Sequence, residues 1–303
     1  YERLQEFFED ILNHKISQGM LVKINRQCYE NLEVPDAKIK EQLIASSILN
    51  HDESGMKING KLHWMHVAST PHLTNYGIHQ TRGKESIDLM GILPSFHGRL
   101  VHDFFRPYFK YDCEHALCNA HHLRELKFIE EEKKQAWAKH MANLLLAIKN
   151  QVEWHQEKNI ELSEIKIQAF EHCYDEILMM GIWHLDNIQK PPEINKYKNR
   201  SKQTKAKNLL DRLRFNKDMV LAFMYDPSIP FTNNQAEQDI RMVKIKQKIS
   251  GCFRSNEGAN WFARIRSYIS TAKKQGQGIL EVLQNAFNEK PFIPKMYGHS
   301  ETA

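Results

Sequence analysis

The sequence predicts an α/β fold in which a strand-rich segment is followed by a long helical block. Short apolar runs alternate with turns between about residues 48 and 118, and apolar residues then recur with a helical period. Pro227 and Pro230 end this helical block ahead of one more capped helix. With 303 residues, 41% of them hydrophobic, the chain is long enough to bury a large core.

The first half of the chain supplies all of the expected strands. Residues 1–42 are predicted to form short amphipathic helices with a break at Val34-Pro35-Asp36. A strand over 48–52 is expected to end in a turn at Glu53-Ser54-Gly55, and strands over 62–70 and 74–80 follow. A helix then opens at Arg82-Gly83-Lys84 and closes at Pro94. Residues 99–103 and 115–118 are the fourth and fifth predicted strands.

The second half is predicted to be helical. Its clearest signal is an apolar stripe at helical spacing, made of Trp137, Met141, Leu144, Leu145, Ile148 and Val152. Further helices are expected over 162–183 and 203–225, separated by a Lys-rich exposed loop around Pro191-Pro192. Asn233 or Asn234 is a good N-cap for a helix to about residue 249, and a helix over 257–274 precedes a short C-terminal helix.

The distribution of charge bears on the kind of binding partner, and the cysteines bear on the cellular compartment. The net charge is +5, but residues 190–217 and 241–274 each carry a local excess of eight positive charges. Such segments indicate either a polyanionic partner or ordinary solvated helix faces. Five irregularly spaced cysteines favour a reducing compartment. No apolar run is long enough for a bilayer span, and the first residues look like a piece of a longer cytoplasmic protein.

Three acidic residues stand at the positions where the predicted element order would place a site. Asp52 and Asp103 end the first and fourth predicted strands, and Glu237 lies in the capped helix. Carboxylates are the ligands that Mg²⁺ prefers, and two such ions about 3.5–4 Å apart activate and stabilise the oxygens of a phosphodiester. Spacing alone leaves simpler roles open, namely turn capping for the aspartates and a favourable first-turn position for Glu237. Glu53 is expected to point to the opposite face of its strand.

Four motifs along the chain resemble those of the DDE transposases of the insertion sequence sixty-six family. They are His51-Asp52-Glu53-Ser54-Gly55, Gly98-Arg99-Leu100-Val101-His102-Asp103, the stretch from Ala116 to Leu126, and the stretch from Pro230 to Arg241. The resemblance implies a ribonuclease-H-like mixed sheet with a large helical insertion before the last catalytic helix. It also implies that Asp52, Asp103 and Glu237 are the catalytic acids, with two Mg²⁺ or Mn²⁺ ions as cofactors.

This resemblance divides the chain into five expected parts. Residues 1–42 are a helical remainder of an amino-terminal region, and 43–123 form the first part of the catalytic domain. Residues 124–230 are the helical insertion, 231–275 carry the acid-bearing and basic helices, and 276–303 form a tail.

Several basic and polar residues are expected to contact DNA or to position the site. The predicted DNA contacts are Arg241, Lys244, Lys248, Arg254, His121 and Arg124. Asn233 and Asn234 are predicted to position the helix that carries Glu237. The cluster formed by Cys113, His115, Cys118, His121 and His122 lacks a second distant ligand pair, so it fits structural zinc patterns poorly.

The predicted function is metal-dependent cleavage of element ends and transfer of the 3′-hydroxyl into target DNA. The expected partners are both DNAs, further copies of the same chain, and helper proteins of the same element. Two alternatives remain open at this point. A nuclease of the same fold would cut without joining, and a decayed transposase would bind DNA without catalysis.

Overall fold

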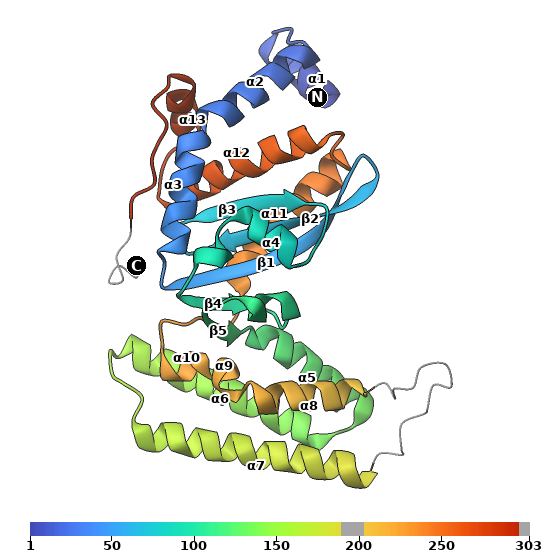
Figure 1. Cartoon of the computed structure of the whole chain (residues 1–303), viewed down its shortest axis with the longest axis vertical. Helices are drawn as coiled ribbons and strands as arrows, with labels where there is room; N and C mark the ends of the chain where they lie inside the picture. Colours follow the sequence, from blue (N-terminus) through green and yellow to red (C-terminus); the bar gives the residue numbers. More distant parts are fainter. Residues whose placement is uncertain (189–202, 297–303) are drawn as a thin grey trace. The chain divides into compact units, whose positions relative to one another are not determined.

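The protein has a mixed α/β fold, which the computed structural model describes over residues 1–188 and 203–296. Within these residues, five strands form one sheet in the order β3-β2-β1-β4-β5 (Figure 1). The chain divides into two compact units. The sheet unit comprises Tyr1–Leu100, Arg106–Glu114 and Asn234–Ala303, and the helical unit comprises Val101–Phe105 and His115–Asn233.

The strands agree with the sequence in number and order but not in the length of the first. They are β1 (Ile48–Ile58), β2 (Lys61–Ser69), β3 (Thr74–His79), β4 (Arg99–His102) and β5 (Glu114–Leu117). The turn predicted at 53–55 is wrong, because β1 continues through it and pairs with β2, with Ser54 opposite Met65. The chain reverses instead at Asn59-Gly60, where both residues have the positive φ that a tight hairpin requires.

The amino-terminal segment is helical, as predicted, but its break is misplaced. The helices are α1 (Glu2–Leu12), α2 (Gln18–Asn31) and α3 (Glu33–Ile44). The break falls at Leu32 rather than at 34–36, because Pro35 lies in the first turn of α3, where no backbone donor is needed. The helix after β3 is α4 (Lys84–Met90), which ends at Gly91, and Pro94 lies in the following 3₁₀ turn, Leu93–Ser95.

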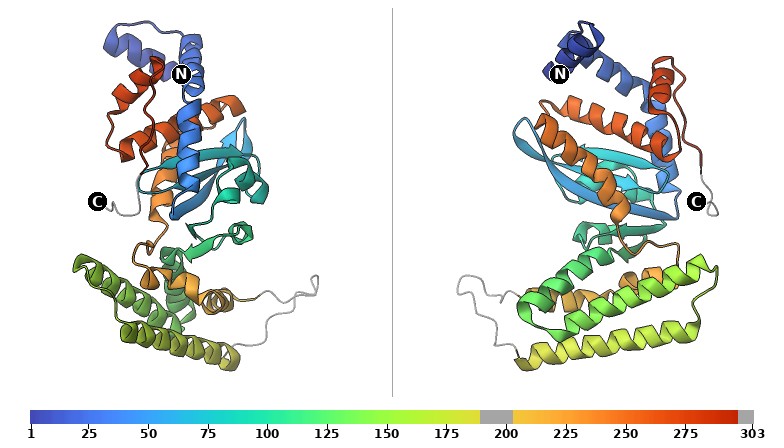
Figure 2. Two further views of the ribbon diagram at one scale, coloured as in Figure 1. Left: turned by 60° about the vertical axis from the view of Figure 1, so that its left-hand side comes forward. Right: turned by 180° about the vertical axis from the view of Figure 1, so that it is seen from behind.

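Two carboxy-terminal helices cover one face of strands β1 to β3. They are α11 (Asn234–Ser250) and α12 (Asn256–Lys274), and both are seen against the sheet in the rear view of Figure 2. The core between them contains Met56, Met65 and Val67 from the sheet, with Ile240 and Val243 from α11. A short helix, α13 (Ile279–Phe287), packs against α2 and α12. This packing presents one flank of α11 to β1 and the other to β3.

The helical unit contains the six helices between β5 and α11 in the part of the chain that the structure describes. They are α5 (Asn119–Lys133), α6 (Ala136–Glu157), α7 (Glu164–Ile188), α8 (Lys205–Phe215), α9 (Lys217–Val220) and α10 (Ala222–Tyr225). The predicted stripe on α6 is confirmed, since Trp137, Met141, Leu145 and Ile148 are buried. The predicted helix over 203–225 is divided into α8, α9 and α10. The loop predicted around Pro191-Pro192 lies outside the described residues.

A buried histidine makes the helical unit sensitive to acid. The ring of His122 hydrogen-bonds the side-chain oxygen of Asn119 at 3.0 Å, and the Asn119 amide donates to the Val220 carbonyl at 2.9 Å. Burial, reinforced by the positive charge of Arg212, lowers the pKa of His122 to about 3. The unfolded chain therefore takes up this proton near pH 6.5, whereas the folded chain does not.

We expect the free energy of unfolding to fall by a few kcal/mol as the pH drops from 6.5 to 4.5, because the unfolded chain is protonated at His122 over this range and the folded chain is not. Urea unfolding at several pH values between 6.5 and 4.5 measures this change. The free energy of unfolding should fall less with pH for His122→Gln than for the wild type. The glutamine can still bond Asn119 but does not titrate. Parallel curves for the two proteins would show that His122 is not protonated differently in the folded and unfolded states.

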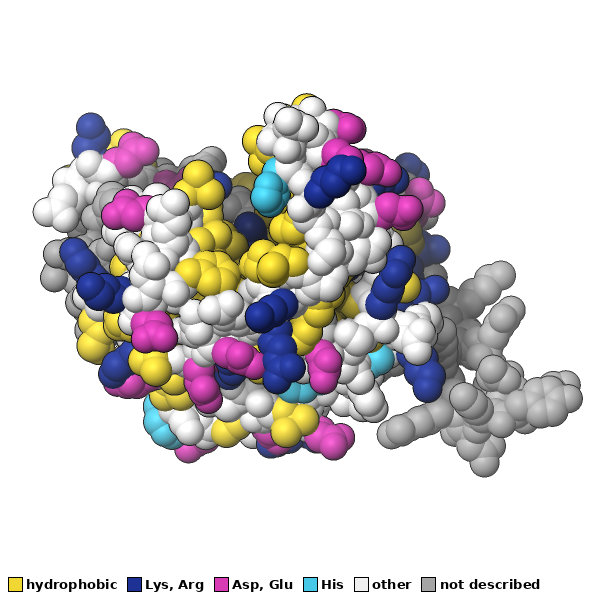
Figure 3. Space-filling model, turned by 90° about the horizontal axis from the view of Figure 1, so that it is seen from above, with side chains coloured by type: hydrophobic (Ala, Val, Ile, Leu, Met, Phe, Trp, Pro, Cys, Tyr) yellow, Lys and Arg dark blue, Asp and Glu magenta, His cyan; other side chains and the backbone are white. Residues whose placement is uncertain are grey.

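The amino-terminal helices expose much apolar surface. Among the described residues of α1 none is buried, and Leu4, Phe7 and Ile11 are all exposed. Figure 3 views the molecule from the end that carries α1 and α2 and shows hydrophobic side chains gathered at the surface. No helix in residues 1–188 or 203–296 has the length and apolar character needed to cross a bilayer.

Candidate active site

Asp52 lies in the middle of β1 on the face that α11 and α12 cover. In the sheet register, Asp52 stands opposite Val67 of β2, which in turn stands opposite Tyr76 of β3. Directly opposed residues share a face, and Val67 and Tyr76 belong to the core beneath α11. The carboxylate of Asp52 is half-buried, and its Oδ1 accepts a hydrogen bond from the backbone N–H of Glu53 at 2.8 Å.

Glu237 lies in the first turn of α11, on the flank of the helix that faces β1. Seven residues further along the same flank, the Lys244 ammonium donates to the Gly55 carbonyl of β1 at 3.1 Å. The opposite flank faces β3, because the Tyr76 hydroxyl donates to the Asp239 carbonyl at 2.9 Å. These contacts fix which side of α11 carries Glu237.

The same contacts set the level of Glu237 along the strand. The helix advances about 10.5 Å from Glu237 to Lys244. The strand advances about 10 Å from Asp52 to Gly55. Lys244 is bonded to Gly55, and the chain after α11 is bonded to β1 through the Phe253 N–H and the Lys57 carbonyl, so the first turn of α11 lies toward the Asp52 side of Gly55. The sheet unit therefore contains two of the three predicted acids, on a strand and a helix that pack against each other.

Asp103 directly follows β4, as the sequence predicts, and belongs to the helical unit. It is half-buried, and its Oδ1 accepts a hydrogen bond from the Phe105 backbone N–H at 3.0 Å. This bond holds the carboxylate in the turn that ends the strand. Its role as the third acid stays a prediction.

Glu53 points to the opposite face of β1, as expected from strand alternation. Its Oε1 accepts from Arg82, with the Nε atom at 2.7 Å and the Nη2 atom at 2.5 Å. Its Oε2 accepts a hydrogen bond from the Tyr108 hydroxyl, which also lies 2.9 Å from the Nδ1 atom of His51. Ligand atoms of His51, Glu53 and His66 all lie within 4.8 Å of one another.

Sequence reasoning missed this polar cluster behind Asp52. Arg82 and Tyr108 are 29 and 55 residues away from Glu53 along the chain, so no local spacing links them. The only local signal was strand alternation, which placed Glu53 on that face. Burial also lowers the pKa of His66 to about 4, helped by the nearby His79, so this ring is neutral at pH 7.

Most of the basic residues predicted to bind DNA lie at the surface of the sheet unit. Arg241, Lys244 and Lys248 are exposed and lie on the same flank of α11 as Glu237. Arg254 is exposed just before α12. Arg264, a further basic residue of α12, contributes to the fold, because it donates to the Tyr29 carbonyl at 2.9 Å and stacks on the Tyr29 ring.

The other predicted contacts and positioning residues lie around the start of α5 and of α11. Arg124 is exposed and half-buried His121 lies beside it, with 3.3 Å between the guanidinium and the ring. Asn233 is buried in the helical unit, and its backbone N–H donates to the Cys118 sulfur at 3.1 Å. Asn234 is the first residue of α11, which places Asn233 in the N-cap position. The predicted start of this helix is confirmed.

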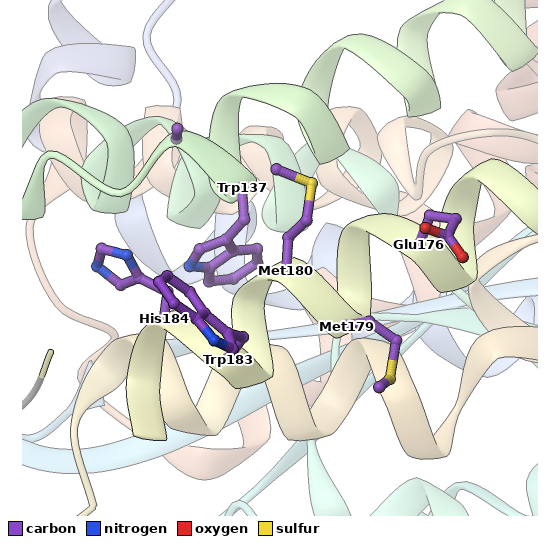
Figure 4. A pocket seen from close by; sticks show the side chains of 7 residues that line it. Trp137, Glu176, Met179, Met180, Trp183 and His184 are labelled. Atoms are coloured by element: carbon purple, nitrogen blue, oxygen red, sulfur yellow. The ribbon is translucent and has the colours of Figure 1, made fainter. Parts of the chain in front are cut away.

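A separate open cavity of about 430 Å³ lies in the helical unit between α6 and α7. Figure 4 shows Trp137 and Met180 at this cavity with Trp183 and His184. The remaining lining residues are Ala136, Glu176 and Met179. Glu176 is the only carboxylate among these lining residues, so the cavity does not offer the cluster of acids that phosphodiester chemistry requires.

Comparison with known proteins agrees with the motifs that carry these acids. A family model described as Transposase IS66 family matches residues 1–261. Comparison with curated proteins finds no match. Because the family model covers well over half of the chain, including Asp52, Asp103 and Glu237, the chain belongs to the Transposase IS66 family.

Proposed function

We propose that the chain is a DDE transposase whose ribonuclease-H-like catalytic domain cuts the ends of a DNA element and joins them to target DNA. The observation that best supports the proposal is the packing of α11, whose first turn carries Glu237, against β1, the strand that carries Asp52. Asp103 is the third acid of the proposed site, and residues 124–230 are the proposed helical insertion.

The acids fit hard divalent cations. Asp52 and Glu237 offer only carboxylate oxygens, which suit Mg²⁺ or Mn²⁺ better than ions that prefer sulfur or imidazole. Asp52, Asp103 and Glu237 would hold two such ions. When bound, these ions would supply charge stabilisation for the attacking and leaving oxygens of a phosphodiester.

The proposed reaction needs no covalent protein intermediate, so no Ser or Tyr nucleophile is assigned. Water attacks a phosphorus atom at the element end, the P–O3′ bond breaks, and the element keeps a free 3′-hydroxyl. That hydroxyl then attacks a phosphorus atom of target DNA, and one P–O bond forms as another breaks. The protein contributes by holding the acids and both DNA strands in place.

The exposed cations on the Glu237 flank of α11 are proposed to hold DNA phosphates. Replacing Arg241 and Lys248 together with glutamine should reduce the slope of log affinity against log salt concentration by about 1.8 for duplex DNA. Affinity at one salt concentration should fall equally for unrelated sequences, because phosphates carry no base identity. Fluorescence anisotropy at several salt concentrations measures both effects. Lys23→Gln/Lys38→Gln is the control with the same change in net charge, and an equal slope for both double variants would contradict the proposed contact.

Strand transfer is the direct test of the proposed function. Pre-cut labelled DNA ends are incubated with a plasmid in Mn²⁺ at low salt, with the wild type and with Asp103→Ala. Joined product that disappears in the variant would support the transposase. Cutting without joining would favour a nuclease of the same fold, and DNA binding with neither reaction would favour a non-catalytic remnant. The proposed reaction brings two DNA ends together, so we also propose that copies of the chain associate. Light scattering of the protein with bound DNA ends would measure the mass of that complex.

A further inference from the structure

The side chains on both sides of Asp52 along β1 are tied to one buried hydroxyl. His51 and Glu53 flank Asp52 and point to the opposite face of the sheet, where both contact Tyr108. The side chain of Glu53 is only 1% exposed, and the Tyr108 residue is fully buried. The backbone at Asp52 is thus held from behind at its two neighbouring residues.

A direct hydrogen bond connects this buried cluster to the Asp52 carboxylate. The backbone N–H of Glu53 donates to Asp52 Oδ1 at 2.8 Å. The direction of that N–H depends on the backbone at Glu53, which pairing with β2 holds in place and to which the side-chain bonds with Arg82 and Tyr108 add a further restraint. A shift of Glu53 would therefore turn the carboxylate of Asp52 as well.

The sheet also leaves little room for Glu53 to move. Opposite Glu53 stand His66 of β2 and Gly77 of β3. A Cβ atom at Gly77 would lie 2.6 Å from the Met90 side chain of α4. Helix α4 therefore packs closely against the sheet beside Glu53 and His66. This packing helps to exclude water from the polar cluster.

A metal ion is a weaker explanation for the same cluster, although His51, Glu53 and His66 have suitable ligand atoms. The guanidinium of Arg82 already neutralises the carboxylate of Glu53, with 2.5 Å between them. A divalent ion would add two further positive charges in a place that is almost without solvent, which is costly. The bonds present account for both carboxylate oxygens of Glu53 without an ion.

We propose that Glu53, held by Arg82 and Tyr108, is a positioning residue that sets the orientation of the Asp52 carboxylate for metal binding. The inference rests on the proposed function, since it assumes that Asp52 is a metal ligand. Groups that orient metal ligands in this way commonly change metal affinity or activity by about 10- to 100-fold when they are removed.

The test measures Mn²⁺ binding to the full chain without DNA, by electron paramagnetic resonance. Tyr108→Phe removes one hydroxyl and with it the bonds to Glu53 and His51. We expect its Mn²⁺ affinity to fall about 10-fold, and its joining rate to fall while its KM for DNA ends is unchanged. Arg82→Lys, which keeps the charge but loses the two-nitrogen contact, is a second variant with a more exposed side chain and the same expected direction.

Tyr174→Phe is the matched control. Tyr174 is also fully buried, and its hydroxyl donates one hydrogen bond, to the Leu213 carbonyl at 2.9 Å in the helical unit. Its loss should also lower the free energy of unfolding, because a buried hydrogen bond is removed, but it should leave Mn²⁺ binding unchanged. A weakening of Mn²⁺ binding shared by both tyrosine variants would indicate a general loss of stability and overturn the proposal.

The outcomes separate this inference from the proposed function. If Asp52→Asn does not weaken Mn²⁺ binding, the proposed metal site itself is wrong. If Asp52→Asn weakens it but Tyr108→Phe and Arg82→Lys bind like the wild type, only the positioning role is wrong. Stoichiometric zinc in the purified wild type that His66→Ala removes would also overturn the proposal, because the cluster would then be a metal site of its own.

Discussion

Glu237→Gln should reduce the joining of DNA ends by about 1,000-fold or more while the protein stays folded. Glutamine keeps the size and helix propensity of the side chain but removes the negative charge. A loss of about 4 kcal/mol of transition-state stabilisation corresponds to this factor and is within the range that a metal site supplies. The measurement is the initial rate of strand transfer in Mn²⁺, with circular dichroism to compare folding.

Glu257→Gln is the control that separates catalysis from helix stability. Glu257 occupies the first turn of α12 just as Glu237 occupies the first turn of α11, and it is exposed. A first-turn acid stabilises its helix by about 0.3–1 kcal/mol through the helix dipole, whatever its other role. If the two variants join DNA at similar rates, Glu237 is an ordinary helix acid and the proposed site is wrong.

The strands were predictable because their signals are local. Alternation and turn residues placed β2 and β3 within one residue at either end, but the same reasoning ended β1 too early at Glu53-Ser54-Gly55. Those residues look like a turn in isolation, yet pairing with β2 keeps them extended. The Asn59-Gly60 dipeptide is the local signal that marks the actual end of β1.

The candidate site was predictable only where a motif or a cap marked it. Asp52 and Glu237 stand out through the motifs and the capped helix, and the structure packs that helix, α11, against β1; their roles stay predictions. Partners such as Tyr108 and Arg82 were not predictable, because a buried hydrogen bond between distant residues leaves no periodic pattern. The same holds for Asp239, whose partner lies 35 residues further along the chain.

The largest expected effect on stability lies at the buried ion pair between Asp239 and Lys274. The Lys274 ammonium lies 2.7 Å from Asp239 Oδ2, and the two side chains are 14% and 13% exposed. The same ammonium donates to the carbonyls of Thr70 and Leu73 in the β2–β3 connection, at 2.8 and 3.0 Å. The pair therefore joins the start of α11, the end of α12 and the sheet at one point.

Asp239→Ala should lower the free energy of unfolding by about 3–5 kcal/mol at pH 7, because it leaves the charge of Lys274 buried without its carboxylate. Urea unfolding measures this loss. Adding Lys274→Met should restore most of it, since no buried charge then remains. Glu41→Ala is the control: it breaks the exposed pair with Lys38, 2.6 Å apart, and should cost at most about 1 kcal/mol.

The pH dependence of this loss distinguishes a buried charge from a packing defect. Burial already lowers the pKa of Lys274, and Asp239 opposes that shift. Without Asp239 the pKa of Lys274 falls further, so the unfolded chain binds more protons than the folded chain up to its ordinary pKa near 10.5. Stability of the variant relative to the wild type should therefore rise between pH 7 and 9.5. If the difference in free energy of unfolding between Asp239→Ala and the wild type stays constant over this range, the variant acts through lost contacts rather than through the unpaired charge of Lys274.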